Sequence, residues 1–111
     1  MITRYALFEG EIHPGRETEF RTFVRERLVP LWTRFPGALD IKVSFEEARD
    51  EGAASYPLIL AVSYPDLAAV DAALQSKVRF ESREVTKELL AMFTGSVHHH
   101  VCEAHTYPPA A

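Results

Sequence analysis

The segment Tyr56-Pro-Leu-Ile-Leu-Ala-Val-Ser-Tyr64 is apolar at both odd and even positions until Ser63. Successive side chains of a β-strand point to opposite faces of the sheet, so the segment predicts a central strand that is covered on both sides. Pro57 fits this interpretation because it stands near the start of the strand, where the missing N–H matters little. The fold must therefore bury both faces of its sheet at this strand.

Three further segments have the character of strands. Residues 2–12 are rich in aromatic and β-branched side chains and contain no proline. Residues 38–46 alternate between apolar and polar side chains, which predicts a strand with one solvated face. Residues 95–105 carry four of the five histidines and predict the last strand. Residues 47–55 are acidic and contain a glycine, so we expect a long hairpin loop there.

Elsewhere the apolar residues recur at steps of three and four. This spacing predicts an amphipathic helix over residues 16–35, and Pro30 inside it predicts a kink because it removes one backbone hydrogen bond. Asp66 is a good N-cap for a second helix. After a weaker stretch over 76–81, a further helical segment is predicted for residues 82–93.

The predicted order of elements is β-α-β-β-α-β within a single domain of residues 1–106, followed by a tail of residues 107–111. Right-handed crossovers turn this order into an α+β, ferredoxin-like fold, in which helices cover one face of a four-stranded antiparallel sheet. The other face would then be bare, although the strand over 56–64 is apolar on both sides. A bare apolar face usually marks an interface, and a two-fold dimer is the commonest solution. We therefore expect a homodimer that packs through its open sheet face.

Particular stretches of the sequence resemble a known superfamily. They are Leu-Val-Pro-Leu-Trp-Thr-Arg-Phe-Pro-Gly at 28–37, Tyr-Pro-Asp-Leu-Ala-Ala-Val-Asp-Ala-Ala-Leu at 64–74, and Phe-Thr-Gly-Ser-Val-His at 93–98. With the order of elements, they make the chain similar to the dimeric α+β barrel superfamily. Within it, the chain most resembles EthD-like (ethyl tert-butyl ether degradation) proteins and domains of the antibiotic-biosynthesis-monooxygenase type.

The resemblance implies a dimer in which two sheets pack face to face and each subunit keeps a cleft between its sheet and its helices. Members of the superfamily include cofactor-independent oxygenases, haem degraders, isomerases, dehydratases and proteins with no demonstrated activity. The chain has no asparagine, and its only tryptophan lies in the first predicted helix. The Asn, Trp and His set of the haem degraders is therefore not matched, and we expect no cofactor.

The histidine run is the densest group of reactive side chains. His98 and His100 share one face of the predicted strand, whereas His99 points to the other. We take His98 and His100 as the catalytic candidates, acting in general acid–base chemistry. Two alternatives stay open: partly buried histidines satisfied by local hydrogen bonds, and a metal site that would need a third ligand. We expect no metal, and the sequence leaves open which face meets the helices.

Four residues are candidates for contact with a substrate: Tyr5, Tyr64, Asp40 and His13. The two tyrosine hydroxyls could orient a flat apolar ligand in a cleft that Trp32 also lines. The alternatives are that Trp32 and the tyrosines belong to the core, that Asp40 forms an interface ion pair, and that His13 lies in a surface turn.

The composition excludes several classes of partner. A net charge of −4 and a pI near 5.7 provide no basic surface for nucleic acid or an anionic membrane. The single cysteine excludes an internal disulfide, and without a charged and apolar leader the expected location is the cytoplasm. We expect a dimer that binds a small, largely apolar metabolite, with isomerisation, dehydration or cofactor-free oxygenation as possible reactions. The alternative is a non-catalytic, stress-responsive or accessory homodimer, so the sequence does not decide whether the protein is an enzyme.

Overall fold

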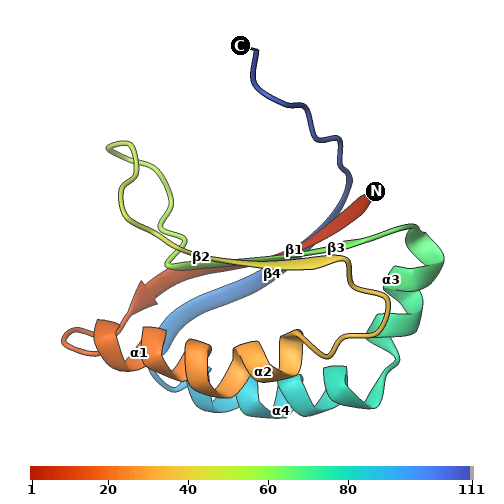
Figure 1. The fold of residues 1–111 in the computed structure, drawn as a ribbon. Helices are drawn as coiled ribbons and strands as arrows, with labels where there is room; N and C mark the ends of the chain where they lie inside the picture. The colour runs from red at the N-terminus through yellow and green to blue at the C-terminus, as the bar shows by residue number, and fades with distance from the viewer. Residues whose placement is uncertain (111) are drawn as a thin grey trace.

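The computed structural model describes residues 1–110 and shows one twisted sheet with all of its helices on one side (Figure 1). Its strands lie in the order β2-β3-β1-β4, and every neighbouring pair is antiparallel. The elements are β1 (Ile2–Ile12), α1 (Glu17–Phe23), the π-helix η1 (Val24–Leu28), α2 (Val29–Trp32), β2 (Asp40–Phe45), β3 (Leu58–Tyr64), α3 (Leu67–Leu74), α4 (Lys77–Leu90) and β4 (Phe93–Glu103). The predicted ferredoxin-like α+β fold is confirmed.

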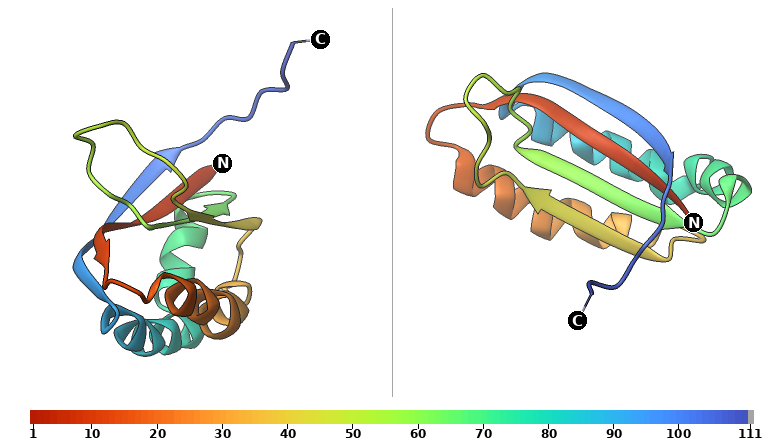
Figure 2. Two further views of the ribbon diagram at one scale, coloured as in Figure 1. Left: turned by 90° about the vertical axis from the view of Figure 1, so that its left-hand side faces the viewer. Right: turned by 90° about the horizontal axis from the view of Figure 1, so that it is seen from above.

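The core lies between the sheet and the layer formed by α1, η1, α2 and α4. Figure 2 shows this layer as two roughly parallel helical rods beneath the strands. The even-numbered side chains of β3, with Ala6 and Phe8 of β1, point into it and are buried. The helices contribute Phe20, Leu28 and Leu89, each of which has no exposed surface. Burial of this apolar area is the main source of stability.

The first helix runs from residue 17 to residue 32, but its middle is a π-helical turn, η1. Pro30 follows directly, at the start of α2. A proline cannot donate a hydrogen bond to the preceding turn, and a π-turn is one way for a helix to accommodate an interrupted ladder. The predicted disturbance at Pro30 therefore takes the form of a π-turn.

The second half of the chain departs from the prediction in one important place. The weak stretch 76–81 is helical, since α4 begins at Lys77 and not near residue 82. Ser76 acts as its N-cap, with Oγ accepting a hydrogen bond from the backbone N–H of Arg79 at 3.4 Å. The helix also ends earlier than predicted, at Leu90, so Phe93 belongs to β4.

No helix within residues 1–110 covers the other face of the sheet, which we call the open face. Tyr5 and Leu7 of β1 lie at its centre beside Ala61 and Ile59 of β3. The loop over 46–57 rises on this side of the sheet, and so does the chain after β4 (Figure 1). The open face is thus apolar at its centre, whereas Ala6 and Phe8 of β1 point to the other side and belong to the core.

The ends of the chain add little to the fold. Residues 104–110 have no regular structure and extend away from the sheet (Figure 2), and residue 111 of the predicted tail lies outside the described residues. None of the helices over residues 1–110 has both the length and the apolar character needed to cross a bilayer.

Candidate functional site: a cleft between the sheet and helix α4

The histidine run of β4 divides between the two faces of the sheet. His98 and His100 lie on the open face, whereas His99 lies on the helix-covered face and pairs with Ala6 of β1. Of the three, only His99 lines the cavity between sheet and helices, together with Val97. The structure therefore shows that the face of β4 with His99 meets the helices. The cavity does not reach His98 and His100, the two catalytic candidates.

His98 has local partners on the open face. Its Nε2 lies 3.2 Å from Oγ of Ser96 and 3.7 Å from Oε1 of Glu9. The hydroxyl of Tyr56 donates a hydrogen bond to the same Glu9 carboxylate at 3.0 Å, and this bond raises the pKa of Tyr56. His98 thus belongs to a small polar group at the sheet surface.

None of the four predicted substrate-contacting residues lines the cavity. Tyr5 is half-buried on the open face, and Asp40 is exposed at the start of the edge strand β2. Tyr64 is 1% exposed, and its burial in the core raises the pKa of its hydroxyl. His13 lies in the turn after β1, where its Nε2 is 2.8 Å from Oγ1 of Thr94. Their roles in binding stay predictions.

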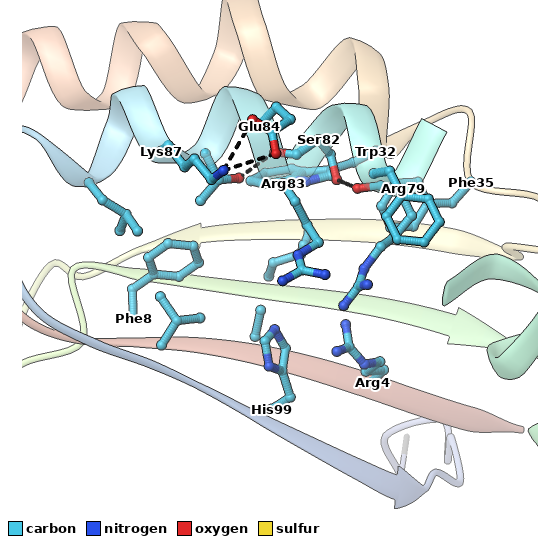
Figure 3. A pocket seen from close by; sticks show the side chains of 16 residues that line it. Arg4, Phe8, Trp32, Phe35, Arg79, Ser82, Arg83, Glu84, Lys87 and His99 are labelled. Carbon is cyan, nitrogen blue, oxygen red and sulfur yellow. Dashed lines mark hydrogen bonds and ion pairs between the residues drawn. The ribbon is translucent and has the colours of Figure 1, made fainter. Parts of the chain in front are cut away.

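The cavity has a volume of about 740 Å³, which is within the usual range for sites that hold a small molecule. Its floor is the helix-covered face of β1, β3 and β4, and its roof is formed by α2 and α4 (Figure 3). We call its apolar lining the apolar wall: Phe8, Trp32, Phe35, Leu60, Leu90 and Val97. Trp32 and Phe8 are each 3% exposed, so they are at once part of the core and part of this wall.

Three arginines meet at the polar side of the cavity. Arg79 and Arg83 extend from α4 toward the sheet, and Arg4 extends from β1 toward them (Figure 3). We call these three residues the arginine cluster. Burial and the charge of Arg79 lower the pKa of Arg4, and burial and the charge of Arg83 lower the pKa of Arg79. Guanidinium groups nevertheless stay protonated in proteins, so the cluster is cationic.

His99 lies beside the arginine cluster (Figure 3). Partial burial is the main reason that the pKa of His99 falls from 6.5 to about 4, and the charges of Arg4, Arg79 and Arg83 lower it further. The ring is therefore neutral at pH 7. A neutral imidazole has one nitrogen that donates a hydrogen bond and one that accepts a hydrogen bond or a proton.

Sequence reasoning missed the arginine cluster and gave His99 no role. Arg79 and Arg83 are spaced by four residues, which places two side chains on one face of a helix. This signal was overlooked because the helix was expected to begin only near residue 82. For His99, the signal was its shared face with Val97 and Val101, since an apolar strand face usually turns toward the core.

The pKa of His99 predicts how stability varies with pH. Between pH 6.5 and pH 4 the unfolded chain binds a proton at this position and the folded chain does not, so the free energy of unfolding falls as the pH is lowered through that range. Solvent screens the partly exposed ring, and we expect a loss of about 1 kcal/mol. In urea denaturation, His99→Gln should flatten this dependence and the tail variant His105→Gln should not. Equal slopes in all three proteins would contradict the pKa assignment.

The chain gives no assembled metal site among the residues that the structure describes. In residues 1–110, no three His, Cys, Asp or Glu side chains lie close enough together to hold one ion.

No protein-family model matches the sequence, and no curated protein matches it. A solved structure of an ethyl tert-butyl ether degradation (EthD) family protein from Bacillus halodurans matches with a TM-score of 0.72 and 19% identity, over 95% of this chain and 99% of that one. SnoaB, a cofactor-independent oxygenase from Streptomyces nogalater, matches with a TM-score of 0.65 and 18% identity, over 98% and 97%. A dimeric protein with a ferredoxin-like fold from Bacteroides fragilis matches with a TM-score of 0.67 and 14% identity, over 93% and 95%.

These likenesses extend over nearly the whole length of each chain, so the predicted resemblance to EthD-like and antibiotic-biosynthesis-monooxygenase-type proteins is confirmed for the fold. At identities below 20% they carry no residue assignments. The chemistry of the site must be argued from the side chains of this chain.

Proposed function

We propose that the protein is a homodimer that binds a small, largely apolar metabolite in the cleft between its sheet and α4, with cofactor-free isomerisation, dehydration or oxygenation as the reaction. The observation that carries the proposal is the cavity itself. It combines the apolar wall with charged and polar side chains from α4, β1 and β4, and sites for small molecules usually join an apolar lining to such polar groups. The alternative of a non-catalytic accessory protein provides no reason for such a cavity.

The proposed dimer packs through the open face. Its centre contains half-buried apolar side chains, Leu7 and Ile59 among them, and no helix of the described chain covers them. The solved neighbours include a dimeric protein with a ferredoxin-like fold. In such a dimer, His98 and His100 would lie at or near the interface between the subunits.

Within the cleft we assign proton transfer to His99. It is the histidine of β4 that lines the cavity, and its neutral ring has one nitrogen that can accept a hydrogen bond or a proton. The adjacent guanidinium groups can stabilise a negative charge that develops on a substrate oxygen when a proton leaves carbon. A catalytic role for His98 and His100 requires instead a substrate bound at the open face.

Binding can be tested with the fluorescence of Trp32, which is the only tryptophan and lies in the apolar wall. A screen of small apolar compounds should find ligands that change its emission saturably. Ala6 lies on the cavity floor, so Ala6→Phe should fill the site and weaken these ligands by at least about tenfold. Ala68→Phe, on the exposed surface of α3, should leave binding unchanged. Equal affinity in both variants would place the ligands elsewhere.

If a ligand from this screen is converted to a product, its turnover rate in histidine variants shows which histidine takes part in the reaction. We expect His99→Ala to reduce turnover by about 100-fold or more, the usual contribution of a general acid or base. His98→Ala and His100→Ala should stay within a few-fold of the parent protein. A large loss of turnover in His98→Ala or His100→Ala, with little change in His99→Ala, would indicate that the reaction takes place at the open face.

A further inference from the structure

Within residues 1–110, no member of the arginine cluster forms an ion pair, whereas four of the six other arginines do. Four other arginines form ion pairs with carboxylates at nitrogen–oxygen distances between 2.6 and 3.4 Å: Arg16, Arg21, Arg27 and Arg49. Over residues 1–110, no such pair involves a member of the cluster, and the guanidinium group of Arg79 lies 6.0 Å from the centroid of the Phe80 ring. Three positive charges thus converge without a counter-ion from the described chain.

The other charged groups of the cavity do not neutralise the cluster. Glu84 lines the cavity, but its carboxylate accepts hydrogen bonds from Nζ of Lys87 at 3.0 and 3.1 Å. His99 is neutral at pH 7 because its pKa is about 4. The polar side of the cavity therefore has an excess of positive charge in a protein whose net charge is −4.

This arrangement works against stability. Like charges four residues apart on a helix, as Arg79 and Arg83 are, weaken the helix. Arg4 and Arg79 are also half-buried, and burial of a charge without a partner is unfavourable. Groups placed at such a cost are often found where a ligand supplies the missing interaction.

We propose that the arginine cluster is an oxyanion-binding site, and that the ligand of the cleft is an organic acid whose carboxylate contacts the cluster while its body packs on the apolar wall. The inference rests on the proposed function and narrows it to a substrate class. A guanidinium group matches a carboxylate with two parallel hydrogen bonds, which fixes orientation as well as affinity. The adjoining wall selects an acid with a sizeable apolar body.

His99 completes the geometry of this site. An acid held by the cluster places its neighbouring carbon atoms near the imidazole, and the neutral ring adds no competing charge. The cluster thus orients the ligand and the histidine lies beside the part that would react.

The test uses isothermal titration calorimetry of the full-length protein at pH 7.5, where His99 is neutral. The probes are 2-naphthoate, its neutral analogue 2-naphthylmethanol, and inorganic phosphate. We expect the parent protein to bind the acid at least about tenfold more tightly than the alcohol, and phosphate more weakly than the acid. Arg79→Ala should weaken the acid about tenfold and the alcohol less than twofold, while Arg79→Lys should recover part of the loss.

Arg27→Ala is the matched control, because Arg27 pairs with Glu88 on the outer surface and does not line the cavity. It should leave the affinity for 2-naphthoate unchanged. If Arg79→Ala proves unstable, as judged by circular dichroism, the exposed Arg83 provides a second variant, Arg83→Ala, with the same expected result.

The outcomes separate this inference from the proposed function. Equal affinity for acid and alcohol, or equal losses in Arg79→Ala and Arg27→Ala, would overturn the oxyanion site and leave a cleft that binds neutral molecules. Phosphate that binds as tightly as 2-naphthoate would overturn the assignment to organic acids. No binding of either naphthyl compound to the parent protein would count against both proposals.

Discussion

Replacing Leu7 with lysine is expected to convert the proposed homodimer into a monomer. Leu7 lies at the centre of the open face, directly opposite Ile59 of β3, so a dimer through this face would bury the new ammonium group without a partner. Such a charge costs about 3–5 kcal/mol, which corresponds to at least about 100-fold weaker association. The folded monomer should survive, because the lysine can extend into water.

Light scattering at micromolar concentration provides the measurement. The parent protein should have twice the chain mass of 12.5 kDa, and Leu7→Lys should have the mass of one chain. Thr22→Lys, which adds the same charge on the exposed side of α1, should remain dimeric. A parent protein with the mass of one chain would contradict the proposed dimer.

Replacing Gly95 with alanine should destabilise the fold by about 2–4 kcal/mol. Gly95 of β4 pairs with Gly10 of β1, and both have positive φ angles, 154° and 149°. A Cβ atom on Gly95 would collide with the backbone carbonyl oxygen of Glu9. Backbone atoms cannot move aside as a flexible side chain can, so the strand pair must separate locally.

Gly52→Ala is a control that adds a Cβ atom at a positive φ angle without a collision. Gly52 also has a positive φ, 82°, but a Cβ atom there would meet nothing within 4 Å. We expect Gly52→Ala to cost about 1 kcal/mol in urea denaturation. If Gly95→Ala costs no more than Gly52→Ala, the close approach of β1 and β4 makes no contribution to stability.

The alternation and spacing of apolar residues were enough to predict the sheet and most of its helices. Residues 56–64 identified the central strand, and the even-numbered side chains of β3 are indeed in the core. The same alternation predicted that His99 and the pair His98 and His100 lie on opposite faces of β4. It could not predict which face is buried, because few apolar residues mark either face. Val101 shares the face of His99 and is still 48% exposed.

The sequence also could not predict which residues the fold brings together in the cavity. The cationic side of the cavity is built from β1 and α4, and the first turn of α4 has a cap, Ser76, and one buried apolar residue, Val78, which is too little for a helical period to show. Only the fold brings Arg4 within reach of Arg79, which lies 75 positions later in the chain. The candidates Tyr5, Asp40 and His100 were chosen for their chemistry, and the register of the sheet places them on the open face or at its edge.

The proposed ligand site lies on the helix-covered face of the sheet, where His99 is, and not on the open face. Nuclear magnetic resonance of protein with isotope-labelled histidine side chains tests this directly, with single His→Gln variants to assign the five imidazoles. On titration with 2-naphthoate, we expect the resonances of His99 to move saturably and those of His98 and His100 to stay in place. Saturable movement of His98 and His100 with His99 unchanged would contradict the account.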